Sequence, residues 1–192
     1  MTHRVFIAIN LPKEIKKKLL IFQKRLKDLP VRWVKEDNLH ITLIFLGYLK
    51  DEEVAEICRI TKEVAQKTAP FLINLKKICY GPPEKMPPRM IWVLGEKSQV
   101  MANFKNNLEK ELSVSSSSNY STNKRHPFSP HITLGRIRQW EWRRIEPEER
   151  PAIEEEISLN FEVQSIEVME SRLKRGGAEY TILETCRLQH EA

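Results

Sequence analysis

The tetrapeptide His-Ile-Thr-Leu occurs twice in the chain, beginning at His40 and again at His131. Histidine is the side chain whose charge changes nearest to neutral pH, so two copies can supply one acid and one base to a single reaction. A threonine, Thr42 or Thr133, follows each histidine by two residues. Successive side chains of a strand point to opposite faces, so each histidine shares a face with its threonine. The sequence therefore predicts an active site built from two His-x-Thr strands.

Acid–base chemistry on a phosphate ester fits this set of side chains. A threonine hydroxyl can donate a hydrogen bond to a phosphoryl oxygen. One neutral histidine can take a proton from a water molecule that attacks phosphorus, while the other, protonated, gives a proton to the departing sugar oxygen. Catalysis of this kind is worth roughly 10²–10⁴ in rate. A strained five-membered cyclic phosphate is a suitable target, because it needs an acid and a base on opposite sides of phosphorus.

The motifs do not predict a metal or a cofactor. The sequence contains no His-Glu-x-x-His, no paired-carboxylate motif and no cysteine pair. Arg136 lies close enough to His131 in sequence to act as an anion clamp. On a regular strand its side chain would face the other way, so a twist, a bulge or a strand end at Gly135 must redirect it.

The charge of the chain suits a polyanionic partner. The formal net charge is +6, from 32 basic and 26 acidic residues, and a basic balance favours RNA. Trp33 and Phe128 are candidates for stacking on a nucleobase, with packing in the core or at its rim as the alternative. This modest excess of charge does not separate RNA from a small cyclic nucleotide.

Strands and helices alternate along the chain without an obvious linker. Apolar patterns predict helices over about 12–26, 51–64 and 98–112, and strands over 4–10, 39–46, 71–80, 90–94, 157–170 and 178–188. The serine-rich stretch 113–123 is expected to be a surface loop rather than a lid. The acidic segment 146–156 holds at most a short helical turn, because it contains two prolines. Three helices among many strands predict an α+β fold of two lobes.

Length and composition describe an ordinary globular protein. A chain of 192 residues, 41% hydrophobic and 30% charged, is long enough for one sizeable core or two small lobes. The sequence lacks an apolar run long enough to cross a bilayer, and its start does not resemble a signal peptide. Three widely spaced cysteines are expected to be reduced thiols. We expect a cytoplasmic monomer that does not bind membranes.

The two motifs and their surroundings resemble the 2H phosphoesterase superfamily, and more narrowly the RNA 2′,3′-cyclic phosphodiesterases, also called 2′-5′ RNA ligases. The likeness is carried by residues 4–12, 32–34, 38–47, 88–93, 127–136, 170–173 and 177–180. It implies a single bilobal domain over 1–192. The two lobes would be pseudo-symmetric, each with an antiparallel sheet and helices outside, and one histidine strand of each would line a central cleft.

The resemblance also implies the reaction, which is metal-independent hydrolysis of RNA 2′,3′-cyclic phosphate termini, tRNA fragments included, to a 2′-phosphate. His40 would be the proton donor to the leaving 3′ oxygen and His131 the proton acceptor that activates water. Thr42 and Thr133 would hold the phosphate. An RNA 5′ hydroxyl in place of water would give weak 2′-5′ ligation.

Two alternatives to this reaction stay open. The first keeps the chemistry but acts on small cyclic nucleotides or ADP-ribose cyclic phosphate. The second is a non-catalytic module that binds RNA or a phospho-ligand in the same cleft. The two intact histidines argue against the second, because binding alone does not need two proton carriers.

Overall fold

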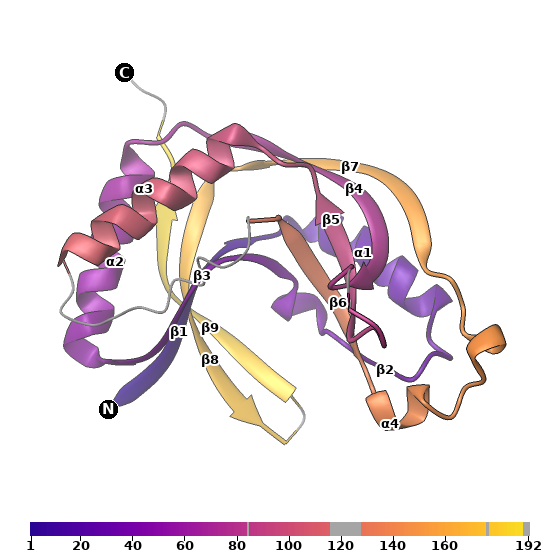
Figure 1. Ribbon diagram of the computed structural model, residues 1–192. Helices are drawn as coiled ribbons and strands as arrows, with labels where there is room; N and C mark the ends of the chain where they lie inside the picture. Colours follow the sequence, from indigo (N-terminus) through magenta and orange to yellow (C-terminus); the bar gives the residue numbers. More distant parts are fainter. Residues whose placement is uncertain (84, 116–127, 176, 190–192) are drawn as a thin grey trace.

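The computed structural model describes residues 1–83, 85–115, 128–175 and 177–189 (Figure 1). Most of the serine-rich stretch 113–123 therefore lies outside the described residues. The elements follow one another as β1 (Thr2–Asn10), α1 (Lys13–Arg25), β2 (Val31–Trp33), a 3-10 helix (Glu36–Asn38), β3 (His40–Lys50), α2 (Asp51–Gln66), β4 (Phe71–Gly81), β5 (Met90–Gly95), α3 (Gln99–Ser115), β6 (His131–Ile137), α4 (Gln139–Trp142), a second 3-10 helix (Pro147–Glu149), β7 (Glu154–Val163), β8 (Ser165–Lys174) and β9 (Gly177–Arg187).

The strands form one antiparallel sheet in the order β7-β4-β5-β6-β3-β1-β8-β9, and β2 pairs with β6 beside this path. The sheet has two halves, β7-β4-β5-β6 and β3-β1-β8-β9. A single registered pair, Ile41 opposite Ile132, joins β3 to β6 and thereby joins the halves. The predicted α+β class with antiparallel sheets is confirmed, and the two sheets that we expected are continuous through this joint.

The predicted inward faces of the helices lie in the core. Ile15 and Leu19 of α1, Ile57 of α2, and Phe104 and Leu108 of α3 are all buried. They pack against one face of the sheet, and α2 and α3 lie side by side along the half that contains β1 (Figure 1). Burying a side chain of this size contributes about 1.5–3 kcal/mol, so these contacts hold the helices on the sheet.

The third strand is longer than the sequence indicates. We expected it to end at Gly47, but β3 continues to Lys50, and Gly47 has a φ of 83° within it, a conformation that glycine adopts readily. The register with β1 shifts twice along this strand. Each shift adds one residue to β3, so Phe45 and Tyr48 are exposed while Leu46 and Leu49 are buried.

The end of the chain holds three strands, where the sequence predicts two. The predicted strand 157–170 is divided at Gln164 into β7 and β8, which lie at nearly opposite ends of the sheet order. The backbone is extended on both sides of this residue and only the pairing partner changes, so the apolar alternation gives no sign of the crossing. The sequence also misses β2 and α4, which have three and four residues and are too short for a periodic pattern.

Candidate active site

The motif side chains lie on the face of the sheet opposite the main core. Ile41 and Ile132 have no exposed surface and point into the core. Because β3 and β6 are antiparallel about this pair, the two motifs run in opposite directions, and each histidine lies level with the other motif's threonine. The structure thus brings together the four predicted side chains, which are partly exposed: His40, Thr42, His131 and Thr133.

Both imidazole rings are held in the same way. Nδ1 of His40 lies 2.7 Å from the carbonyl oxygen of Asn38, and Nδ1 of His131 lies 2.8 Å from that of Ser129. A carbonyl oxygen only accepts hydrogen bonds, so Nδ1 carries the hydrogen in both rings. Each histidine therefore uses Nε2 for chemistry, as an acceptor when neutral and as a donor when protonated.

Aromatic rings surround His40. The Phe6 ring lies 5.1 Å from the imidazole, and the Tyr180 ring meets it edge-on at 5.2 Å, measured between ring centroids. Nε2 of His40 lies 2.9 Å from the Thr42 hydroxyl. The hydroxyl donates to the neutral ring and accepts from the protonated ring, so it follows the protonation state of the histidine.

His131 stacks on a tryptophan that the motif analysis did not select. Its ring centroid lies 3.9 Å from that of Trp92, with 24° between the planes. Trp92 rests on the backbone of Gly81, where an added Cβ would come within 2.2 Å of its ring. The alternation of Met90 and Trp92 with buried neighbours along β5 is the one sequence signal that places this ring on the site's face.

The contact at Gly81 gives a prediction for catalysis. We expect Gly81→Ala to push the Trp92 ring away from its place against His131 and lower kcat/KM about tenfold, because small misplacements of catalytic groups are costly. The overpacked side chain should also destabilise the fold by about 1–3 kcal/mol. Steady-state kinetics and thermal unfolding measure the two effects. A variant with unchanged kcat/KM would show that the stacked ring does not position His131.

Burial dominates the protonation of both histidines. It lowers the pKa of His40 below the ordinary 6.5, and the positive charges of Lys16 and of His131 lower it further, against the hydrogen bond to Asn38. Burial also lowers the pKa of His131, against the hydrogen bond to Ser129. Without substrate, both rings are therefore mainly neutral at pH 7.

A β-bulge in β6 turns Arg136 toward the histidines' face. In the pairing of β5 with β6, Ile91 lies opposite Gly135 and Trp92 lies opposite Thr133, so one residue of β6 is extra. Beyond the bulge, Ile137 is buried and Arg136 is exposed. Of the three ways in which Arg136 could be redirected, the structure has the bulge. The strand does not end at Gly135, because β6 continues to Ile137.

The position of Arg136 beside β5 agrees with this orientation. Its guanidinium lies 3.7 Å from the sulfur of Met90, which shares a face of β5 with Trp92. Trp92 in turn stacks on His131. A cation is therefore available on the same face as the motif histidines.

The two aromatic residues predicted to stack on a base lie elsewhere. Trp33 is opposite Gly135 and packs against the core, with its indole nitrogen buried and without a hydrogen-bond partner. Phe128 is half-buried and packs against the core, with the ammonium of Lys105 lying 5.5 Å from its ring centroid. Neither ring is among those that contact the two histidines, and their roles in substrate binding stay predictions.

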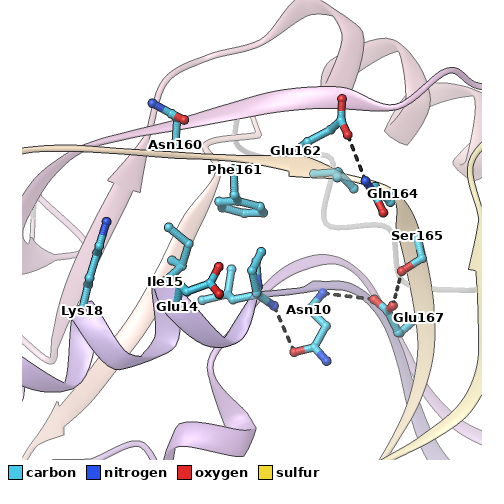
Figure 2. A pocket seen from close by; sticks show the side chains of 13 residues that line it. Asn10, Glu14, Ile15, Lys18, Asn160, Phe161, Glu162, Gln164, Ser165 and Glu167 are labelled. Atoms are coloured by element: carbon cyan, nitrogen blue, oxygen red, sulfur yellow. Dashed lines mark hydrogen bonds between the residues drawn. The ribbon is translucent and has the colours of Figure 1, made fainter.

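One cavity of the protein lies away from the motifs. It has a volume of about 600 Å³ and lies between the start of α1 and the crossing from β7 to β8 (Figure 2). Its charged side chains are Lys18 and three glutamates, Glu14, Glu162 and Glu167, and no motif side chain lines it. An acidic lining repels a phosphate. The open face that carries the histidines is therefore the better candidate for phosphate chemistry.

The parts of the chain that the structure describes contain neither a cluster of metal-ligating side chains nor a membrane-spanning helix. No group of three or more His, Cys, Asp or Glu side chains is placed to hold a metal ion there. No helix in those parts is long and apolar enough to span a membrane.

The fold is shared with solved proteins, a phosphoesterase among them. A Thermus thermophilus structure is 26% identical with a TM-score of 0.79, covering 97% of this chain and 100% of that one. The structure of Escherichia coli LigT complexed with 3′-AMP is 25% identical with a TM-score of 0.75, covering 99% and 100%. Together with the motif-bearing face, these likenesses define the class of the protein, which is a phosphoesterase.

Sequence comparisons point in the same direction. The model of the LigT-like phosphoesterases matches residues 9–92. An RNA 2′,3′-cyclic phosphodiesterase of Thermotoga maritima is 29% identical, with 97% of this chain and 96% of the relative covered. One of Methanocaldococcus jannaschii is 28% identical, with 94% and 98% covered. The chain is thus similar to the LigT-like phosphoesterases and to proteins named RNA 2′,3′-cyclic phosphodiesterase, in agreement with the resemblance seen in its motifs.

Proposed function

We propose that this chain, as a single bilobal domain of residues 1–192, hydrolyses RNA 2′,3′-cyclic phosphate termini to 2′-phosphates without a metal ion. The observation that carries the proposal is the matched pair of histidines on one face. In each, Nδ1 is bound to a backbone carbonyl, so Nε2 is the nitrogen for proton transfer; in His40 this Nε2 contacts the Thr42 hydroxyl. The relatives named RNA 2′,3′-cyclic phosphodiesterase support the choice of substrate.

In the proposed reaction, the two histidines act on opposite sides of phosphorus. Nε2 of His131 accepts a proton from water as the water oxygen bonds to phosphorus. Nε2 of His40 donates a proton to the 3′ oxygen as its bond to phosphorus breaks. Hydroxyls of Thr42 and Thr133 donate hydrogen bonds to the phosphoryl oxygens, and the Arg136 guanidinium offsets their charge. The product is a 2′-phosphate beside a free 3′ hydroxyl.

A lowered pKa suits the role of His131 as the base better than the role of His40 as the acid. A neutral His131 is ready to accept a proton at pH 7. His40 must first be protonated, although its pKa is lowered as well. The phosphate of the substrate favours the charged ring, so binding raises the pKa of His40. The acid is therefore charged mainly in the complex.

These directions predict the pH dependence of the reaction. We expect kcat/KM to rise with pH as His131 loses its proton and to fall as His40 loses its own, and both pKa values lie below 6.5. The maximum of kcat/KM should therefore lie below pH 6.5, while the maximum of kcat lies higher because the bound phosphate raises the pKa of His40. Rates from pH 4.5 to 9 on saturating and dilute RNA test this. A kcat/KM still rising at pH 8 would contradict a base whose pKa lies below 6.5.

A small cyclic nucleotide is the second candidate substrate. The observation that favours this alternative is the E. coli LigT structure with 3′-AMP, in which a similar protein holds a mononucleotide. Ligation through an RNA 5′ hydroxyl should be a minor reaction in water.

One experiment tests the proposed function. Purified protein in EDTA is incubated with a short RNA ending in a 2′,3′-cyclic phosphate and, separately, with 2′,3′-cyclic AMP, and the products are resolved as 2′- or 3′-phosphates. We expect a 2′-phosphate from both substrates and faster opening of the RNA. Exclusive 3′-phosphate would contradict the assigned leaving group, and no turnover of either substrate would overturn the proposal.

A further inference from the structure

Two arginines lie directly opposite each other beside the motif. Arg32 of β2 pairs with Arg136 of β6 in the antiparallel register. The neighbouring pair, Val31 and Ile137, is buried, so both arginines point away from the core. Directly opposed residues on antiparallel strands project from the same face. Arg32 therefore shares the face of Arg136, which is also the face of the histidines.

This pair is electrostatically unfavourable in the protein alone. Like charges that face each other across two strands destabilise the pairing. Some arginines elsewhere form salt bridges with carboxylates: Arg25 with Glu155, Arg59 with Glu56 and Glu63, Arg138 with Glu141, and Arg172 with Glu170. What sets Arg32 and Arg136 apart is that each faces another cation across the strands. Within the described residues, neither Arg32 nor Arg136 forms a salt bridge, and Arg136 contacts the sulfur of Met90 instead. An anion from outside would supply the missing countercharge.

The position of the pair suits a second phosphate of the substrate. Arg136 lies three residues beyond Thr133, about 10 Å along the strand at 3.3 Å per residue, and its guanidinium contacts Met90, which shares a face of β5 with Trp92. Arg32 lies one strand further to the side, on β2 (Figure 1). One guanidinium can thus meet the cyclic phosphate while the other is left for the next phosphate of the chain.

We propose that Arg32 binds the phosphodiester that precedes the terminal nucleotide. The enzyme then recognises a chain of at least two nucleotides, because a mononucleotide has no phosphate at that place. Guanidinium groups suit this role, since their planar donors match two phosphate oxygens at once. The inference rests on the proposed function, whose site it extends by one subsite.

The test compares a dinucleotide ending in a 2′,3′-cyclic phosphate with 2′,3′-cyclic AMP. We expect the ratio of their kcat/KM values, dinucleotide over mononucleotide, to fall about five- to tenfold in Arg32→Ala and further in Arg32→Glu. The slope of log kcat/KM against log salt for the dinucleotide should become shallower by about 0.7, the value for one lost contact to a single strand. Arg187→Ala, an exposed arginine at the end of β9, is the matched control and should keep both the ratio and the slope.

Binding separates this inference from the reaction itself. Fluorescence anisotropy of a labelled dinucleotide ending in a 2′-phosphate gives Kd without turnover, and we expect a weaker Kd in Arg32→Ala with a Tm no lower than that of the wild type. If Arg32→Ala opens both substrates with the ratio, the salt slope and the Kd of the wild type, the proposed subsite is wrong and the proposed function stands. If neither is opened, the proposed function fails, and an Arg32-dependent Kd would still support the phosphate contact.

Discussion

Replacing His131 with alanine is expected to lower kcat by about 10³, within the range typical of a lost general base. The ring contacts Trp92 and a backbone carbonyl, so its loss removes the proton acceptor while the buried residues that flank it in β6 remain. His40→Ala should cost a similar factor through loss of the proton donor. The double variant should be little slower than either single variant, because the two groups act as one unit.

Single-turnover rates on an RNA with a 2′,3′-cyclic phosphate measure these losses. The matched control is His3→Ala, which removes a third histidine whose ring contacts Asp51 and Glu170 instead of the motifs. We expect that variant to retain its rate. If His131→Ala keeps more than a tenth of the wild-type kcat, another group accepts the proton and the mechanism proposed above is wrong.

Ile132→Ala is expected to destabilise the protein by about 2–5 kcal/mol and to impair catalysis as well. The side chain has no exposed surface, so truncation leaves a cavity in the core. It also removes one member of the only registered pair between the two motif strands of the described chain. Catalysis should suffer because the relative position of the histidines depends on this pair. Ile132→Val should cost only about 0.5–1.5 kcal/mol.

The comparison with Ile73→Ala separates stability from geometry. Ile73 is equally buried but lies in β4, which carries no motif residue. Denaturant unfolding should give similar losses for the two variants, and kcat measured where both are folded should fall only in Ile132→Ala. Equal rates in the two variants would show that the joint does not position the histidines.

Local pattern in the sequence is sufficient for the histidine strands and for the helices. The alternation in His40-Ile41-Thr42 assigns the faces, and the spacing of Ile15 and Leu19 in α1 identifies an inward side. The faces of the motif strand and the inward side of α1 depend only on neighbours along the chain, and the structure shows both as predicted.

Local sequence patterns do not predict the features that depend on the order of the strands in the sheet. Tyr180 and Trp92 reach the two histidines because of the positions of β9 and β5 in the sheet, which no local pattern encodes. The sequence indicates that some irregularity must turn Arg136 toward the histidines. It does not give the position of the bulge, because a bulge is defined by the register with the neighbouring strand, here β5. The crossing at Gln164 is hidden for the same reason, since it changes only which strand is the partner.

The order of the strands also has a consequence for how the site is assembled. One half of the sheet takes β1, β3, β8 and β9, and the other takes β2 and β4 to β7, so neither half is a continuous piece of the chain. No single cut separates the halves, and a fragment that stops before β7 lacks strands of both. Closing such distant pairings is slow and costs chain entropy. We expect the backbone amides of Ile41 and Ile132 to exchange hydrogen only through the same opening event. His40 and His131 would then take up and leave their positions in the site together.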